Sequence, residues 1–408
     1  MFSKKQLITV SLIMGLLFHF VFYFHIYGPH ISSLESPFVF LLPIASAFIM
    51  IFIYLFTYWR AGLKGSWTRW AFDLLVLWIF VCFVRSLIEM KSISDIIPFL
   101  FSGYVGLVLF PVLFFIVGVN IHYFFSFNRL LSIYFFIAAF ISIFFITYSE
   151  LQHFLLLFIF YMILTIPLRS FWPRLLILII SISVVIFSLT NRAEIIRITL
   201  SYFILIAYYL LLHKRISKKL LYLIVFILLA IPVISLYLGF KGQSVFQMKS
   251  SDAATYSELD PYADTRTFLY YEVYLDLKQN DAILFGKGMS SGYYSDSFKT
   301  SNRLVVEVGF LQIILKTGVF GFILYITVII SSIVQALSKS RNQFIKSLGM
   351  LLATYVVMLF IENIIAYNLL NIVIWVIVGM CNSEALRSLS DSDIKKLFND
   401  GSFLKSLA

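Results

Sequence analysis

The chain has 408 residues, of which 61% are hydrophobic and 12% charged, and its formal net charge is +11. Soluble domains carry about 25% charged residues, so this composition excludes an ordinary soluble domain. The apolar residues form runs of about 20 residues, which is the length that a helix needs to cross a bilayer. These runs lack the alternation of barrel strands. The sequence therefore predicts an all-α integral membrane protein.

The first apolar run, residues 6–27, follows Lys4 and Lys5 and superficially resembles a secretion signal. It is too long for a signal, lacks a cleavage site of small residues and precedes further apolar runs, so we expect a retained first helix. About twelve transmembrane helices are expected in all, at roughly 20 residues each. The candidate spans are 6–27, 37–57, 69–90, 96–119, 129–148, 151–168, 174–190, 194–212, 219–239, 304–337, 344–366 and 368–381.

One large polar segment, residues 241–303, interrupts the apolar runs. It carries seven Lys or Arg residues and eight Asp or Glu residues. A chain that is otherwise solvated by lipid places its chemistry where it keeps charge in contact with water. We therefore expect a single membrane domain with nine helices in 1–240, an extracytoplasmic catalytic loop at 241–303, three helices in 304–381 and a polar cytoplasmic tail at 382–408. In that tail, the segment Asp391–Phe398 is expected to form a short interfacial helix.

Lysine and arginine concentrate in alternate connections, for example at Arg60 and Lys64 and again at Lys214 and Arg215. By the positive-inside rule these connections are cytoplasmic. Both termini are then cytoplasmic, and the loop at 241–303 lies on the opposite side of the membrane. The net charge is thus an orientation signal that also attracts anionic lipid. It does not indicate a nucleic-acid partner.

Two arginines stand at the beginning of the eighth span. An arginine at mid-bilayer costs about 2.5–3.5 kcal/mol on insertion scales, and less near the end of a helix. Arg192 lies beside Thr190 and Asn191, on the same side as the large loop, which favours anion binding. For Arg197, substrate binding and an interfacial ion pair with Glu194 are equally open.

The large loop contains further basic candidates. The segment 264–278 predicts an amphipathic helix whose tyrosines suit the headgroup level of a membrane. It begins near Arg266, which is a candidate for substrate contact, although an arginine there can also snorkel. The turn Gly286-Lys287-Gly288 follows, and its spacing is typical of a plain flexible turn. Lys287 and Arg303 are candidates for substrate binding, and Arg303 alternatively marks the start of the next span.

Glu307 stands roughly one turn inside the apolar run 304–337. A carboxylate in such a position costs free energy unless it faces a polar cavity. The alternative is a salt bridge to Arg303, four residues earlier on the same helix face. A shielded carboxylate facing a polar cavity suits a general base. Glu362, near the outer end of the eleventh span, is expected to line the same cavity.

Several motifs are missing. The six histidines all lie outside 241–303, and no His/Cys cluster has metal-ligand spacing. No Walker-type loop is present, so bound ATP is not the energy source. Cys82 and Cys381 both fall in apolar runs and imply no disulfide. The sequence therefore predicts chemistry without a metal or another cofactor.

These features together resemble the bacterial O-antigen polymerase and O-antigen ligase superfamily, whose members have about twelve spans and one large outer loop late in the chain. The ligases open a span with a Thr-x-Ser-Arg turn, and Thr190-Asn191-Arg192 is similar but one residue shorter. The loop of the family has an Arg followed by aromatic residues and a Gly-x-Gly turn. Arg266, the tyrosines that follow it and Gly286-Lys287-Gly288 resemble that pattern.

The most specific part of the resemblance is a ligase segment, His-Asn-x-x-Leu-x-x-x-x-Glu-x-Gly-x-x-Gly. This chain matches it at Leu311, Gly318 and Gly321. Glu307 stands at the position of the catalytic His, and Lys316 stands where the ligases have Glu. Polymerases of repeat units vary more here and often show a Val-Glu-x-Gly start like this one, so the resemblance favours a polymerase.

What the resemblance implies is a Wzy-type polysaccharide polymerase of O-antigen and lipopolysaccharide biosynthesis. It would join repeat units carried on undecaprenyl diphosphate by inverting, metal-independent glycosyl transfer on the periplasmic face of the bacterial inner membrane. Arg192 and Arg266 would clamp the departing diphosphate, because the arginine fork matches phosphate oxygens. Glu307 would take the proton of the acceptor hydroxyl. Four further residues are candidates for substrate binding: Arg197, Lys287, Arg303 and Glu362.

Two alternatives remain open. A flippase or transporter of lipid-linked oligosaccharide also has about twelve or more spans, but such proteins usually show internal repeats and broken helices at mid-membrane. An O-antigen ligase would move finished polymer onto the lipid A core. The expected partners are the undecaprenyl-diphosphate-linked oligosaccharide and membrane lipid, and a protein that regulates chain length is a further candidate.

Overall fold

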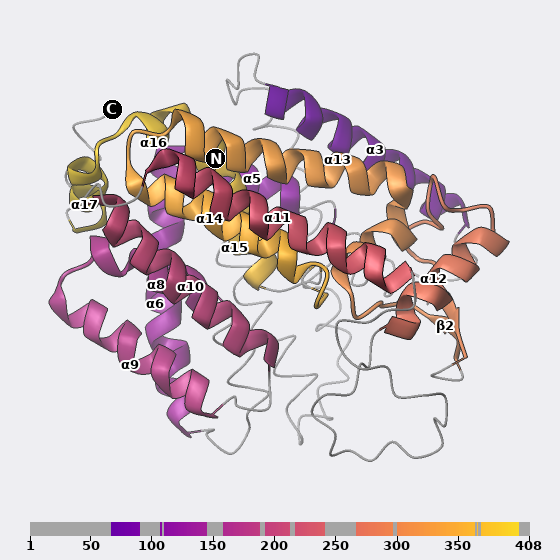
Figure 1. The fold of residues 1–408 in the computed structure, drawn as a ribbon, viewed down its shortest axis with the longest axis horizontal. Helices are drawn as coiled ribbons and strands as arrows, with labels where there is room; N and C mark the ends of the chain where they lie inside the picture. Colours follow the sequence, from indigo (N-terminus) through magenta and orange to yellow (C-terminus); the bar gives the residue numbers. More distant parts are fainter. Residues whose placement is uncertain are drawn as a thin grey trace, which may run out of the picture.

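A computed structural model describes ten segments of the chain (Figure 1), which are residues 67–89, 107, 110–144, 158–187, 192–212, 217–240, 267–296, 300–363, 365 and 369–399. The spans predicted at 6–27 and 37–57 lie outside these residues, as does the loop segment 241–266. The described residues are mostly helical. The predicted helical class is therefore confirmed for these residues, while the count of about twelve spans and the large extracytoplasmic loop stay predictions.

The described helices overlap the predicted spans, but some ends differ by eight residues. The helix predicted at 129–148 begins at Ile121, and the helix predicted at 344–366 ends at Met358. Four of the described helices contain stretches long and apolar enough to cross a membrane, namely Trp67–Ile88, Ile121–Phe140, Ile195–Leu212 and Gly309–Lys339. The elements are α3 (Trp67–Glu89), α5 (Phe110–Val119), α6 (Ile121–Phe144), α8 (Ile159–Thr165), the 3-10 helix η3 (Ile166–Leu168), α9 (Phe171–Phe187), α10 (Arg192–Leu212), α11 (Lys218–Phe240), α12 (Thr267–Gln279), β1 (Tyr293–Ser295), β2 (Thr300–Arg303), α13 (Gly309–Lys339), α14 (Gln343–Met358), α15 (Leu369–Asn382), α16 (Glu384–Ser388) and α17 (Asp391–Asn399).

The long helix α13 organises the bundle. It packs against α3, α14 and α15, while α14 also contacts α10 and α11, and α15 lies against α5. In Figure 1, α12 and β2 lie at one end of α13 and α3, and α16 and α17 lie at the other. We call the first the loop end, which comprises α12, the β1–β2 hairpin, the start of α13 at Gly309 and the residues that follow α14. The other is the tail end.

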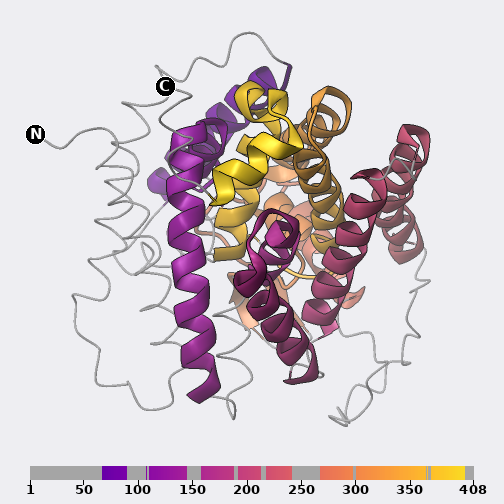
Figure 2. The same ribbon diagram turned by 90° about the vertical axis from the view of Figure 1, so that its left-hand side faces the viewer.

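The tail end is closed by the C-terminal helices (Figure 2). A helix is predicted at Asp391–Phe398, and α17 confirms it. Asp391 accepts a hydrogen bond from the main-chain N–H of Gln343 at 2.7 Å, at the start of α14. Asn399 donates to the carbonyl of Leu168 at 2.7 Å. The tail helix is therefore bonded to two parts of the membrane domain.

The contact between α5 and α15 depends on two glycines. A Cβ on Gly118 would lie 2.0 Å from the carbonyl oxygen of Val376, and a Cβ on Gly379 would lie 2.2 Å from that of Phe115. Small residues let helix backbones approach closely in membranes, where van der Waals packing drives association. The two backbones therefore touch directly at these positions.

Substitution of Gly379 by leucine is expected to lower the free energy of unfolding by about 1–3 kcal/mol or more, because main-chain atoms cannot move aside. Thermal unfolding in detergent measures the loss. Gly349→Ala is the matched control, since its new methyl group would meet the Cβ of Ala336 at 2.8 Å but no backbone atom closer than 3.6 Å. Equal losses in the two variants would contradict a special role for the α5–α15 contact.

A kink divides α13 near the loop end, within the span predicted at 304–337. Gly318 has φ 75° and ψ 177°, which are not helical angles. The loop after α12 is inserted at this kink, and a Cβ on Gly318 would lie 2.2 Å from the carbonyl oxygen of Leu284. Four main-chain hydrogen bonds of 2.8–3.2 Å connect the two segments, from Lys287 to Leu315, Gly288 to Lys316, Val319 to Ile283 and Phe320 to Leu284. We call residues 283–288 and 315–320 together the kink joint.

Helix α3 covers the kink joint from the other side. The indole N–H of Trp78 donates to the carbonyl of Thr317 at 2.9 Å. Arg85 donates to the carbonyls of Phe285 and Gly286 at 3.2 and 2.9 Å. Backbone groups released by a break in a membrane helix need such partners, since lipid offers none. The turn Gly286-Lys287-Gly288 is therefore not the flexible turn that its sequence predicts, because its backbone bonds to a helix and packs against it.

Candidate active site

Arg303 and Glu307 form an ion pair at the loop end. The Arg303 Nη2 atom lies 2.6 Å from the Glu307 Oε1 atom. The two residues are paired at the predicted spacing of four, but they do not share a helix face as predicted. Helix α13 begins only at Gly309, and Glu307 lies in a bend before it. The side chain of Glu307 is 41% exposed. The carboxylate thus lies at the surface, next to the start of a membrane helix, and not one turn inside that helix as predicted.

Tyr293 supports this pair from the neighbouring strand. The antiparallel strands β1 and β2 place Tyr293 opposite Arg303. The second branch of the guanidinium, Nη1, donates to the Tyr293 hydroxyl at 3.1 Å. Burial raises the pKa of the Tyr293 phenol above its ordinary value, so the phenol stays neutral. Arg303 is thereby held between a carboxylate and a buried hydroxyl, which fixes the direction in which Glu307 is presented.

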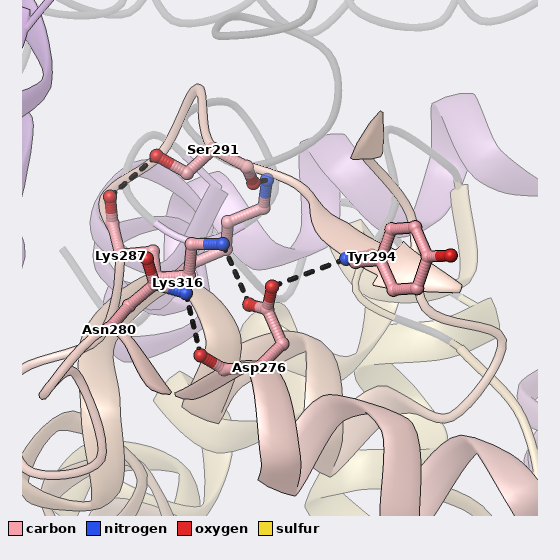
Figure 3. A network of polar contacts seen from close by, with 6 residues as sticks. All are labelled: Asp276, Asn280, Lys287, Ser291, Tyr294 and Lys316. Atoms are coloured by element: carbon pink, nitrogen blue, oxygen red, sulfur yellow. Dashed lines mark hydrogen bonds and ion pairs between the residues drawn. The ribbon is translucent and has the colours of Figure 1, made fainter. Parts of the chain in front are cut away.

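A second polar network joins the hairpin to the kink joint (Figure 3). Lys287 Nζ lies 2.7 Å from Asp276 Oδ2 on α12. The other oxygen of Asp276 accepts from the main-chain N–H of Tyr294 at 3.3 Å. Ser291 donates to the carbonyl of Lys287 at 2.6 Å, and the buried Lys316 donates to the carbonyl of Ser291 at 2.6 Å. Lys287, a candidate for substrate binding, is therefore engaged by a carboxylate in this structure.

Arg197 and Glu362 form a third charged contact. The Arg197 Nε atom lies 3.2 Å from the Glu362 Oε1 atom, and their side chains are 8% and 17% exposed. The main chain of Glu362 accepts from the N–H of Gly309 at 3.1 Å. Asn363, the next residue, donates to the carbonyl of Val306 at 2.8 Å. The predicted pair of Glu307 and Glu362 is thus brought to the same end of the bundle, on directly bonded segments.

Replacing Glu362 with glutamine is expected to cost about 2–3 kcal/mol of folding free energy, because the buried Arg197 charge loses this carboxylate. The combined change of Arg197→Met and Glu362→Met removes both charges, and we expect it to restore most of the loss. Unfolding in detergent measures both variants. Additive losses in the double variant would show that the two side chains do not stabilise each other.

The side chains of the two predicted clamp arginines lie outside the described part of the chain. Arg192 is the first residue of α10, and its side chain lies outside the described part. It precedes Arg197 by five residues, which is about 7.5 Å along the axis of a helix. Arg266 is itself outside the described residues and directly precedes the first residue of α12, Thr267. Their shared role therefore stays a prediction.

Sequence reasoning missed three residues that the structure makes central, which are Asp276, Tyr293 and Lys316. All three are buried. Asp276 lies within an amphipathic helix, where a carboxylate reads as part of the polar face. Lys316 had a usable signal, because a lysine inside an apolar span is costly and usually has a partner or a function. Tyr293 had none, since hairpin register decides its partner.

Comparison with known protein families gives a match in the region that contains most of the candidate site. Residues 196–326 match the family model Wzy_C, described as O-antigen ligase. The match covers about a third of the chain, and this segment is therefore similar to the O-antigen ligase family. Neither curated proteins nor solved structures gave a match. The stretch that belongs to the superfamily model includes Arg197, Lys287, Arg303 and Glu307, and it ends before Glu362.

Proposed function

We propose that this chain is a polysaccharide polymerase that joins oligosaccharide repeat units carried on undecaprenyl diphosphate. The observation that carries the proposal is the half-exposed carboxylate of Glu307, oriented by Arg303 beside the first turn of α13. Such a carboxylate can meet a sugar hydroxyl from the water side while the lipid part of the substrate stays among apolar helices. A general base of this kind contributes about 10²–10⁴-fold to a transfer rate.

In the proposed reaction, the acceptor hydroxyl oxygen attacks the anomeric carbon of the donor sugar. The bond from that carbon to the diphosphate oxygen breaks, and the electron pair leaves with the undecaprenyl diphosphate. Glu307 takes the proton of the acceptor hydroxyl. Attack from the side opposite the leaving group inverts the anomeric centre. The donor is already activated, so the step needs no nucleotide.

The departing diphosphate requires stabilisation of its negative charge. Arg192 and Arg266 are proposed as the clamp, because guanidinium groups bind phosphate oxygens through paired hydrogen bonds. Arg197, held by Glu362 at 3.2 Å, lies on the same helix as Arg192 and would fix the position of that helix. Lys287 would support the clamp if substrate displaced it from Asp276.

Sidedness belongs to the same proposal. We place both termini in the cytoplasm and the loop end on the periplasmic side of the bacterial inner membrane. In this arrangement, residues 1–240 and 304–381 form the membrane helices, 241–303 the periplasmic loop and 382–408 the cytoplasmic tail. The positive-inside distribution of Lys and Arg supports this orientation. Membrane lipid would surround the bundle, and a chain-length regulator is a further candidate partner.

A ligase is the second candidate, because the matching family model carries the description O-antigen ligase. A ligase would use the same donor but transfer finished polymer to a different acceptor. Glu307, rather than a histidine, stands at the position where ligases carry their catalytic residue, which supports the polymerase over the ligase.

The first experiment reconstitutes the purified protein in liposomes with a repeat unit linked to undecaprenyl diphosphate. A ladder of lengthening oligosaccharide is expected from the wild-type protein without added metal. Transfer only to a lipid A core acceptor would make the chain a ligase. Movement of intact lipid-linked sugar between leaflets, without any new linkage, would make it a transporter. Transporters often contain interrupted helices, and α13 is kinked.

A further inference from the structure

Lys316 is a fully buried lysine in a helix that is long and apolar enough to cross a membrane. Burial of an ammonium group is costly unless it is paired or bonded to oxygen. Its Nζ atom donates to the carbonyl of Ser291 at 2.6 Å. This contact connects α13 to the loop between α12 and β1 (Figure 3).

The bonded segment leads directly to the proposed catalytic pair. Ser291 lies two residues before Tyr293, the hydroxyl that accepts from Arg303 at 3.1 Å. Arg303 in turn lies 2.6 Å from Glu307. A short series of contacts therefore runs from the kink of α13, through the loop and the hairpin, to the carboxylate.

The loop has a second attachment, at Met289. The main-chain N–H of Met289 donates to the hydroxyl of Ser86 on α3 at 2.6 Å, and Met289 is fully buried. Met289 thus lies between the kink joint and Ser291. A loop held at Met289 by α3 and at Ser291 by α13 leaves little freedom for the strand that follows.

We propose that Lys316 is a positioning residue which, through Ser291 and the hairpin, sets the place of Arg303 and Glu307 for glycosyl transfer. The proposal rests on the proposed function. Lys316 itself touches no reacting atom, because its side chain has no exposed surface. Its loss is expected to release the loop, displace the catalytic pair and leave donor binding unchanged. A displacement of about 1 Å can lower a catalysed rate by as much as 10²-fold.

The position of the loop is tested without any activity measurement. A cysteine is introduced at Met289, and its labelling by a membrane-impermeant maleimide is compared between the otherwise wild-type protein and the Lys316→Met variant. Cys82 and Cys381 are buried and give little background. We expect slow labelling with Lys316 present and at least about tenfold faster labelling without it. A cysteine at Tyr294, which is 53% exposed, should label equally in both.

The transfer assay then separates positioning from mere stability. Lys316→Met is expected to lower kcat by about 10–100-fold with KM for the donor unchanged. Lys316→Gln, which keeps a shorter donor, should fall between this variant and the wild-type protein. Ser332→Ala is the matched control. Ser332 lies in the other half of α13 and accepts a buried hydrogen bond from Asn382 of α15, so its loss should alter neither the labelling nor the transfer rate.

The outcomes are distinct. If the folded Lys316→Met variant keeps its rate, or if the cysteine at Met289 stays protected, the inference is overturned. If neither the Met nor the Gln variant folds, Lys316 is a stability residue and the inference is also wrong. A wild-type protein that makes no ladder would contradict the proposed function, while the labelling result would still decide whether Lys316 holds the loop.

Discussion

The Glu307→Gln variant is expected to fold normally and to transfer sugar about 10²–10⁴-fold more slowly than the wild-type protein. The amide keeps the size of the side chain and can still accept from Arg303, but it cannot take a proton from the acceptor hydroxyl. Glu307 is 41% exposed and lies outside the hydrophobic core, so its change to an amide should leave the thermal unfolding midpoint nearly unchanged. Ladder formation in liposomes, followed over time, measures the rate.

Asp296→Asn is the matched control for this prediction. Asp296 is an exposed carboxylate that follows β1 and accepts from the Tyr294 hydroxyl at 2.7 Å. Its neutralisation removes the same charge from the same hairpin region, and we expect the transfer rate to stay within about twofold, because a surface group contributes little. Equal loss in the two variants would indicate an effect of local charge. Retained activity in Glu307→Gln would eliminate Glu307 as the base.

The Gly318→Ala variant is expected to lose most of its folded population. An L-residue at φ 75° is strained, and its Cβ would lie 2.2 Å from the carbonyl oxygen of Leu284. The main chain of Leu284 is itself bonded to Phe320, so it cannot move away without breaking the kink joint. Together these effects should cost about 3 kcal/mol or more. The yield of monodisperse protein in detergent and its thermal unfolding measure the effect.

Ile323→Ala provides the comparison on the same helix. Ile323 is 56% exposed on α13, one turn beyond the kink, and its truncation removes surface that faces outward. We expect near-normal yield and an unfolding midpoint close to that of the wild-type protein. If Gly318→Ala were equally well tolerated, the kink would be a deformable part of the helix and not a fixed joint.

Helices were the most predictable part of this molecule, because their signal is local. Runs of about 20 apolar residues specify a membrane helix whatever the rest of the chain does. Segment 264–278 was predicted as an amphipathic helix and Asp391–Phe398 as a short interfacial helix. They are found as the helices α12 (Thr267–Gln279) and α17 (Asp391–Asn399). The ends shift by a few residues because caps and tertiary contacts decide them.

The kink joint could not be predicted, because its partners are distant in sequence. Gly286-Lys287-Gly288 has the composition of a flexible turn, and nothing nearby shows that Leu315 and Lys316 will accept its N–H groups. Arg85 likewise lies in an apolar span, and its guanidinium donates to Gly286, 201 residues away. Such contacts depend on which helices pack together, and the hydropathy of the sequence does not predict that packing.

The candidate site shows the same division. The pairing of Arg303 with Glu307 follows from a spacing of four residues and was foreseen as one of two possibilities, although the two residues lie before the helix and not on it. The pairing of Arg197 with Glu362 could not be foreseen, because two separate spans supply it. For Arg192 and Arg266, the shared role remains a prediction that rests on residue type and position along the chain.

The contact of α5 with α15 has a consequence for how the protein is made. Ser383, just after α15, donates to the carbonyl of Val119 at the end of α5, across 264 residues of sequence. A ribosome completes α5 long before it makes α15, so α5 must wait in the membrane with its glycine surface unmatched. Until α15 has been synthesised, lipid or the insertion machinery has to occupy that surface. A chain truncated before residue 369 would therefore leave its N-terminal half without the helix that completes it.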